Sequence, residues 1–209
     1  MEPYEPAAPI IWLESAESTN KVLRSRSGSL DNLSIIAARS QTAGRGQGDH
    51  TWFSSPDTNL TFSILYRFGG DCRIAASEAI LITQVTTLAL RDYLLEKGVE
   101  ARIKWPNDIW VGDRKICGIL IENTLVGQEV RESIVGIGLN VNETGWPQEL
   151  PNPVSLREIT GRAYDLQEEL AGLHKTICRR FGQLATPDGR SSLQEEFGKF
   201  MFRLPEGQR

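Results

Sequence analysis

The sequence predicts an α+β domain in which a mixed, largely antiparallel β-sheet is flanked by helices. Two observations predict this fold class: strand-like runs are grouped along the chain, and helical stretches flank them. The 209 residues, of which 40% are hydrophobic and 24% charged, suffice to bury one core and are typical of a globular protein. We therefore expect one principal domain over residues 10–185, preceded by a flexible segment at residues 1–9.

The first quarter of the chain predicts strands separated by a helix and a loop. Residues 10–13 form a short apolar run, and Ser18-Thr-Asn20 offers helix-cap chemistry to the segment that follows. Residues 33–38 are apolar and β-branched, which predicts a buried strand, whereas residues 59–68 alternate apolar and polar side chains. Between these two strands lies a glycine-rich loop at residues 41–48.

The rest of the chain predicts two longer helices that enclose further strands. The first helix is expected over residues 74–97, where Gly98 serves as its C-cap, and the second over residues 165–181, where apolar residues recur at helical spacing. Turn residues separate three strand-like runs between these helices, at residues 100–104, 115–122 and 133–141.

Composition excludes several function classes. The formal net charge of -4 gives no support to nucleic-acid binding, which usually needs a basic surface. Three widely spaced cysteines and two histidines form no metal-ligand pattern, so reduced thiols and a cytoplasmic location are expected. No apolar run approaches about 18 residues, so we expect no membrane span and no signal peptide.

Three cations next to glycines are the main chemical signal. Arg45 lies within Gly44-Arg-Gly-Gln-Gly48, Lys104 ends a strand before Trp-Pro-Asn-Asp108, and Lys115 begins another strand. Glycines let backbone N–H groups approach a ligand, and arginine or lysine suits phosphate and carboxylate groups. Without a Ser–His–Asp triad or an activated cysteine, this set favours charge stabilisation of phosphoryl or adenylyl transfer.

Each segment also has a purely structural interpretation. The glycine-rich loop can be a flexible hairpin, Asn107 and Asp108 can form an Asx-turn, and Lys115 can point into water. Gly136 and Gly138 either leave space above the sheet for a flat ligand, which Asn140 would bond, or serve tight packing. Cys117 is expected to be a small core residue.

Taken together, the segments resemble the catalytic domain of biotin protein ligases, over roughly residues 11 to 185. The matching motifs occur in the family's order: Glu17-Ser-Thr-Asn20, Gln41-Thr-Ala-Gly-Arg-Gly46 with Trp52, Lys104-Trp-Pro-Asn-Asp108, Arg114-Lys115 before Gly118-Ile-Leu, and Gly136-Ile-Gly-Leu-Asn140. The Lys-Trp-Pro-Asn-Asp run is highly specific to this family. The resemblance implies a sheet like that of class II aminoacyl-tRNA synthetases and biotin ligases.

The resemblance also implies a two-step reaction. The carboxylate of biotin attacks the α-phosphate of ATP, which brings Mg²⁺ on its phosphates, to give biotinyl-5′-AMP and pyrophosphate. A lysine of a biotin carboxyl carrier protein then attacks this anhydride and AMP leaves. The partners expected on this basis are biotin, ATP and the carrier protein, and a homodimer is left open.

Roles for individual residues follow from the same resemblance. Lys115, Arg45 and Lys104 are the expected catalytic residues, and Lys115 would meet the biotin carboxylate and the charge at phosphorus. The expected biotin-binding residues are Ser18, Thr19, Asn20, Gln41, Gly44, Arg45, Gly46, Gln47, Lys115, Gly118 and Gly136. The expected ATP- and adenylate-binding residues are Trp52, Lys104, Asn107, Asp108 and Asn140.

The sequence departs from the family pattern in three ways. Gln47 stands where several members carry a second arginine, which we expect to weaken retention of the adenylate. Nothing before Ile10 is long enough for the winged helix-turn-helix of repressor-type ligases. Residues 186–209 are expected to be the remnant of a connection to a missing SH3-like C-terminal domain.

Two alternatives remain beside the biotin ligase. A lipoate or octanoate ligase of the same fold is expected to carry an Arg-Arg-x-Ser-Gly-Gly-type loop, which this sequence lacks. A biotin-binding relative without catalytic activity would bind biotin but would not form the adenylate.

Overall fold

The structure is a computed structural model, and it describes residues 8–46, 48 and 51–203. The flexible segment predicted at residues 1–9 therefore lies mostly outside the described residues, as does Gln47. The described strands are β1 (Ile10–Leu13), β2 (Ile35–Ala38), β3 (Leu60–Arg67), β4 (Arg102–Lys104), β5 (Asp108–Val111), β6 (Arg114–Val126), β7 (Glu129–Leu139) and β8 (Met201–Phe202). The α-helices are α1 (Thr19–Arg26), α2 (Ile80–Glu96), α3 (Leu156–Thr160), α4 (Leu166–Gly182) and α5 (Pro187–Phe200).

All eight strands form one sheet in the order β1-β2-β3-β7-β6-β5-β4-β8. The five inner pairings are antiparallel, whereas β1 pairs with β2 and β4 pairs with β8 in parallel at the two edges. The longest pairing joins β6 and β7, which are connected by a turn at Gly127, where φ is +62°. The predicted fold class, a mixed and largely antiparallel sheet with flanking helices, is thereby confirmed.

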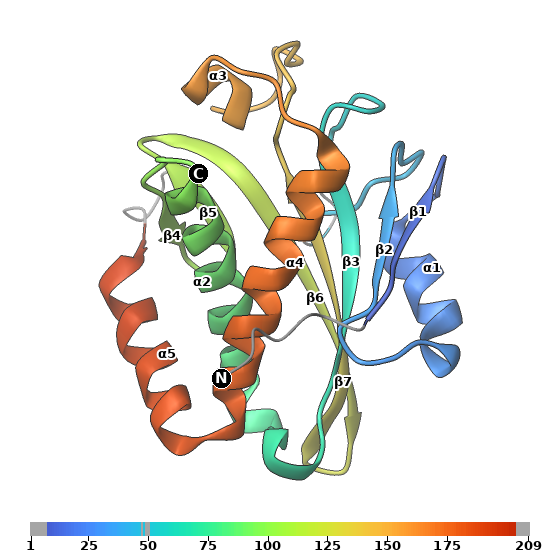
Figure 1. The fold of residues 1–209 in the computed structure, drawn as a ribbon, viewed down its shortest axis with the longest axis vertical. Coiled ribbons are helices and arrows are strands. Elements are labelled where there is room, and N and C mark those ends of the chain that lie inside the picture. Colours follow the sequence, from blue (N-terminus) through green and yellow to red (C-terminus); the bar gives the residue numbers. More distant parts are fainter. Residues whose placement is uncertain (1–7, 47, 49–50, 204–209) are drawn as a thin grey trace.

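The helices divide unequally between the two faces of the sheet. Helices α2, α4 and α5 lie on one face, and α1 lies on the other, beside β1, β2 and β3 (Figure 1). The main core lies under α2 and α4 and contains Phe62, Ile64 and Tyr66 of β3. On the opposite face a small cluster, formed by Leu23, Ile36, Leu65 and Ile134, holds α1 to the sheet. The rest of this second face is left for a cavity.

Several elements differ from those that the sequence predicts, and two of these differences have a clear physical cause. Helix α2 begins at Ile80 instead of residue 74, because the chain before it lies along the start of β7. The carbonyl of Ile74 accepts the N–H of Val130, and Ala75 forms an antiparallel bridge with Glu129. Strand β5 was not predicted at all, since its four residues lie between two turns. The predicted C-cap is confirmed: Gly98 follows α2 with φ of +77°.

The segment after residue 185 packs against the same domain. Thr186 caps α5 by accepting the N–H of Gly189 at 3.1 Å, and Pro187 occupies the first turn, where its missing N–H is harmless. Strand β8 then pairs with β4, so residues 187–202 complete one edge of the sheet. Residues 187–202 therefore pack as part of the domain that was predicted to end at residue 185.

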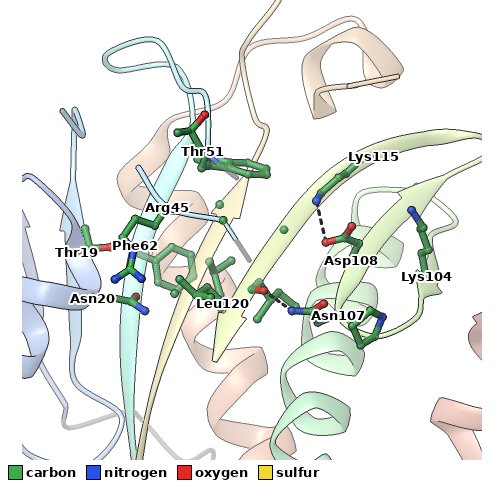
Figure 2. Close-up of a pocket in the computed structure, with 18 of the residues that line it drawn as sticks. Thr19, Asn20, Arg45, Thr51, Phe62, Lys104, Asn107, Asp108, Lys115 and Leu120 are labelled. Atoms are coloured by element: carbon green, nitrogen blue, oxygen red, sulfur yellow. Dashed lines mark hydrogen bonds and ion pairs between the residues drawn. The ribbon is translucent and has the colours of Figure 1, made fainter. Parts of the chain in front are cut away.

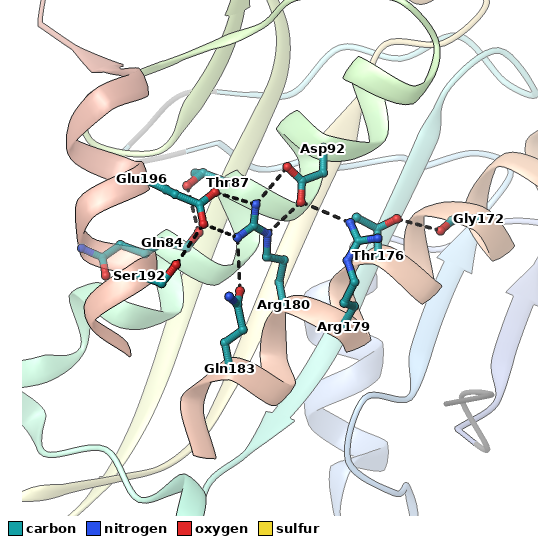
Figure 3. Close-up of polar contacts among 10 residues, drawn as sticks. All are labelled: Gln84, Thr87, Asp92, Gly172, Thr176, Arg179, Arg180, Gln183, Ser192 and Glu196. Carbon is teal, nitrogen blue, oxygen red and sulfur yellow. Dashed lines mark hydrogen bonds and ion pairs between the residues drawn. The ribbon is translucent and has the colours of Figure 1, made fainter. Parts of the chain in front are cut away.

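A charged cluster ties α5 to the other two helices on this face (Figure 3). Arg180 of α4 donates to both oxygens of Asp92 in α2, at 2.7 and 3.0 Å, and to both oxygens of Glu196 in α5, at 3.0 and 2.8 Å. The hydrogen bonds from Arg180 lower the pKa of Glu196, so this carboxylate is ionised at neutral pH. Such bidentate pairs are among the stronger polar contacts in proteins.

We predict that Arg180→Ala lowers the free energy of unfolding by about 3 kcal/mol, because it removes the guanidinium that bridges Asp92 and Glu196 and leaves the partly buried Glu196 without this partner. Arg179→Ala is the matched control, since Arg179 reaches the same Asp92 at 3.2 Å but is mostly exposed. Its loss is expected to lower stability by less than about 1 kcal/mol. Urea denaturation measures both, and equal losses in the two variants would show that burial does not strengthen the Arg180 contacts.

Candidate functional site

A cavity of about 380 Å³ opens on the sheet face that α1 only partly covers (Figure 2). Its volume lies in the range of small-molecule sites. The predicted site residues that line it are Ser18, Thr19, Asn20, Gln41, Arg45, Gly46, Trp52, Lys104, Asn107, Asp108, Lys115, Gly118 and Gly136. Segments far apart in the sequence therefore meet at one place, as the ordered motifs predict.

Two predicted site residues that the structure describes, Gly44 and Asn140, do not line the cavity. Gln47 lies outside the described residues. Gly44 supports the loop instead, because its carbonyl accepts the N–H of Trp52 at 3.0 Å. The buried Asn140 donates through Nδ2 to the carbonyls of Val154, at 3.0 Å, and Lys115, at 3.4 Å. Asn140 thus holds the backbone of Lys115 in place, and its contact with an adenine stays a prediction.

One end of the cavity is a network of buried hydroxyl and amide groups. Ser18 precedes α1 in the N-cap position but makes no side-chain cap bond, and the N–H of Thr19 donates instead to Oε1 of Gln41 at 2.9 Å. The hydroxyl of Ser63 on β3 lies 2.7 Å from the Thr19 hydroxyl and 2.5 Å from Oδ1 of Asn20. This end suits a ligand group that both donates and accepts hydrogen bonds.

Ser63 was missed by the sequence analysis, although a signal was present. Thr61 and Ser63 alternate with the core residues of β3, so they belong to the face away from α2. Both are buried nonetheless, because α1 packs against β3 on that face.

The glycines of β6 and β7 make room for the protein's own side chains. A Cβ on Gly136 would lie 2.3 Å from Oδ1 of Asn20, and a Cβ on Gly138 would lie 2.2 Å from the Trp52 ring. A Cβ on Gly118 would also meet Trp52, at 2.8 Å. Trp52 and Asn20 occupy the space next to these glycines and form walls of the cavity, which agrees with the tight-packing interpretation. All three glycines also line the cavity, so their contact with a flat ligand stays a prediction.

The other end of the cavity is cationic. Lys115 points into it, with Nζ 2.8 Å from Oδ1 of Asp108 and 5.7 Å from the centre of the Trp52 ring. Lys104 ends β4, and its Nζ lies 4.7 Å from the centre of the Trp110 ring. The interpretation of Lys115 as a lysine that points into water is thereby excluded. Two lysines and one carboxylate leave a net positive charge at this end, as an anionic ligand requires.

Arg45 adds a third cation from the glycine-rich loop. The loop is held as a hairpin by a bridge between Arg45 and Thr51 and by the contact of Gly44 with Trp52. The guanidinium is half exposed and lies 3.9 Å from the carboxylate of Glu122, a residue that the sequence analysis did not select. Because the loop follows an apolar strand and carries its cation over the cavity, it is placed to cover a bound anion.

The wall that carries Lys104 is supported by the C-terminal elements. The N–H of Trp105 donates to the carbonyl of Phe202 at 2.9 Å, and the Trp105 ring meets Phe197 of α5 edge to face at 6.5 Å. On the other side, Nδ2 of Asn107 donates to the carbonyl of Ile119. Asn107 therefore joins the turn at residues 105–107 to β6. An Asx-turn alone, the structural alternative for Asn107, does not account for this contact.

Other chemistries find no support among the described residues. Burial raises the pKa of the Cys117 thiol, which agrees with its prediction as a core residue, and the three cysteines are unpaired. Within residues 8–46, 48 and 51–203, no group of three or more His, Cys, Asp or Glu side chains could hold a metal ion. None of the helices described here is long and apolar enough to cross a membrane.

One family model matches the part of the chain that carries the predicted site. The model of the Biotin/lipoate A/B protein ligase family matches residues 12–140, which include every predicted site residue. The biotin–[acetyl-CoA-carboxylase] ligase of Paracoccus denitrificans is 34% identical over 183 residues, which cover 83% of this chain and 73% of that protein. The bifunctional ligase/repressor BirA of Escherichia coli is 34% identical over 125 residues, but these span only 38% of its length.

Solved structures show the same fold. The biotin protein ligase from Aquifex aeolicus in complex with biotin and ATP superposes with a TM-score of 0.76 at 27% identity, over 93% of this chain and 78% of that one. The biotin protein ligase from Leishmania major in complex with biotin gives a TM-score of 0.74 at 25% identity, over 98% and 88% of the two chains.

We predict that Gly138→Ala displaces Trp52 and loosens the loop, because a methyl group cannot fit beside the ring. Overpacking of this kind costs about 1–3 kcal/mol, so exchange of the Trp52 amide proton should accelerate roughly tenfold or more. Gly172→Ala in α4 is the control, since its new Cβ would meet nothing within 4 Å. Hydrogen exchange read by NMR tests this, and an unchanged Trp52 rate in Gly138→Ala would contradict the packing described above.

Proposed function

The chain belongs to the Biotin/lipoate A/B protein ligase family, and from this premise we propose that it is an ATP-dependent biotin–protein ligase. It would activate biotin as biotinyl-5′-AMP and transfer the biotinyl group to a lysine of a biotin carboxyl carrier protein. One observation carries the proposal: a single cavity joins a buried hydrogen-bonding end to a cationic end. The three unpaired cysteines support a reducing, cytoplasmic setting.

The two ends of the cavity match the two ends of biotin. The ureido ring carries N–H donors and a carbonyl acceptor, which suit Thr19, Asn20 and the Gln41 side chain at the α1 end. The carboxylate at the end of the valeryl chain would then lie toward Lys115. This orientation puts the reacting oxygen beside the cations and the recognised ring at the neutral end.

Activation requires the carboxylate oxygen to attack the α-phosphorus while pyrophosphate leaves. Lys115, Lys104 and Arg45 would stabilise the negative charge that gathers on the α-phosphate oxygens, because preorganised cations act most strongly on charge that develops in the transition state. The Asp108 carboxylate holds Nζ of Lys115 at 2.8 Å, so that this cation is positioned before the substrates arrive.

The adenylate must then be protected until the carrier lysine reaches it. Trp52 closes one side of the cavity over Gly118 and Gly138, and Arg45 covers it from the hairpin loop. Exclusion of water slows hydrolysis of the mixed anhydride. The uncharged lysine amine attacks the anhydride carbonyl, AMP leaves with the bridging oxygen, and the amine loses a proton.

Mg²⁺ is expected to arrive with ATP. We propose that its ligands are mainly phosphate oxygens, as is usual for this ion. Asp108 supplies the carboxylate in the cavity lining, and Asn107 keeps its Oδ1 available because only its Nδ2 is used toward Ile119. When bound, the ion would neutralise part of the phosphate charge.

The same cavity argues against lipoate as the preferred substrate. The dithiolane ring of a lipoyl group has no N–H or C=O groups to pair with Thr19, Asn20 and Gln41, which line this end of the cavity. Polar groups that lose water without gaining a partner disfavour such a ligand strongly.

Intact-mass analysis of a biotin carboxyl carrier domain tests the proposal. After incubation with this protein, biotin and Mg-ATP, the carrier should gain the mass of one biotinyl group, and omission of biotin or ATP should abolish the gain. Biotin binding without adenylate formation would instead identify a non-catalytic relative, and modification by lipoate alone would identify a lipoate ligase.

We predict that Lys115→Ala slows biotin-dependent pyrophosphate release about 10²- to 10³-fold, as loss of one preorganised charge-stabilising group does in other enzymes. Stability should change little, because Lys115 is partly exposed and ends at the cavity. Arg114→Ala is the control: this neighbour is exposed and should retain near-normal activity. A Lys115→Ala variant that released pyrophosphate at the normal rate would remove Lys115 from the mechanism.

A further inference from the structure

Glu122 links helix α1 to the glycine-rich loop just beyond the cavity. It lies near the middle of β6, two residues after Leu120, so it shares the cavity face of the sheet with Gly118 and Leu120. Its Oε2 accepts the Nδ2 hydrogen bond of Asn20 at 2.9 Å and lies 3.3 Å from the guanidinium of Arg24. Its Oε1 faces Arg45, at 3.9 Å.

We propose that Glu122 is a positioning residue that pairs with Arg45 in the free enzyme, and that an anionic ligand competes with Glu122 for the Arg45 guanidinium. The inference rests on the proposed function, because the anion concerned is the carboxylate of biotin or the phosphate of its adenylate. Glu122 itself does not line the cavity, so it acts only through Arg45 and Asn20, which do.

The ion pair between Arg45 and Glu122 is weak enough for a ligand anion to replace Glu122. Arg45 is half exposed and its contact with Glu122 is at the outer limit of an ion pair, whereas Oε2 is held by two groups of α1. Pairs between exposed charges are weak, so a ligand anion in a drier position competes well for the guanidinium. Glu122 therefore keeps Arg45 near the cavity and at the same time lowers its net affinity for the ligand.

Glu122→Gln separates the charge from the hydrogen bond. A glutamine Oε1 still accepts from Nδ2 of Asn20, so the α1 end of the cavity keeps its contact, but Arg45 loses its resting counter-ion. We expect biotinyl-5′-AMP to bind about two- to fivefold more tightly to this variant, since exposed pairs are weak. Isothermal titration calorimetry on the full chain gives the Kd.

Glu132→Gln is the matched control. Glu132 lies on the neighbouring strand β7, on the same face of the sheet, and has its own arginine partner, Arg67, at 3.8 Å. Neither Glu132 nor Arg67 is among the described residues that line the cavity, so the Kd of this variant for biotinyl-5′-AMP should equal that of the wild type. In an Arg45→Gln background, Glu122→Gln should have no effect, because the competition it removes no longer exists.

The outcomes separate this inference from the proposed function. If the wild type binds biotinyl-5′-AMP and Glu122→Gln binds it no more tightly, or if the gain persists in the Arg45→Gln background, the competition is refuted. A wild type that does not bind the adenylate refutes the proposed function instead. The rate of tryptic cleavage after Arg45 then decides the inference without a ligand: it should rise about two- to fivefold in Glu122→Gln and not in Glu132→Gln, and an unchanged rate overturns it.

Discussion

The cavity exists because two neighbouring strands carry glycine where larger side chains would fill the sheet face opposite the core. Gly118 on β6 pairs with Gly138 on β7, and Gly136, two residues earlier on β7, lies on the same face of the sheet. With no Cβ at these positions, Trp52 and Asn20 approach the backbone and become walls. The position of the loop that carries Arg45 depends on this close approach, since the N–H of Trp52 donates to the carbonyl of Gly44 in that loop.

The same arrangement gives an acidic chain a cationic cavity. The net charge of -4 is distributed elsewhere, while Lys115, Lys104 and Arg45 converge on one concave face. Strand β5 contributes the carboxylate that orients Lys115, and the α5–β8 segment supports the wall that carries Lys104. The helices on the core face therefore support the cavity wall on the other face through the edge strands β4 and β8. The Arg180 cluster contributes to this support because it holds α5, which precedes β8, against α4.

Most of the elements and of the site could be predicted from sequence, for identifiable reasons. Helix α4 combines a strong apolar period with Asp165 as its N-cap, and β2 is continuously apolar, so both stand out locally. Lys104 and Lys115 stand out because a cation at the end of an apolar strand usually has a partner.

What could not be predicted depends on contacts between distant segments. Strand β5 is too short for a periodic signal, and β8 exists only because β4 offers it an edge. The position of Glu122 next to Arg45 follows from the path of the loop, and the filling of the glycine face by Trp52 follows from the hairpin between residues 44 and 52. Neither leaves a pattern along the chain.

Biotin-dependent exchange of labelled pyrophosphate into ATP tests the central claim most directly, because it reports reversible adenylate formation in the cavity without a carrier protein. The account predicts exchange that requires both biotin and Mg²⁺ and is not supported by lipoate. Exchange that lipoate supports and biotin does not, or no exchange with either acid, would contradict it.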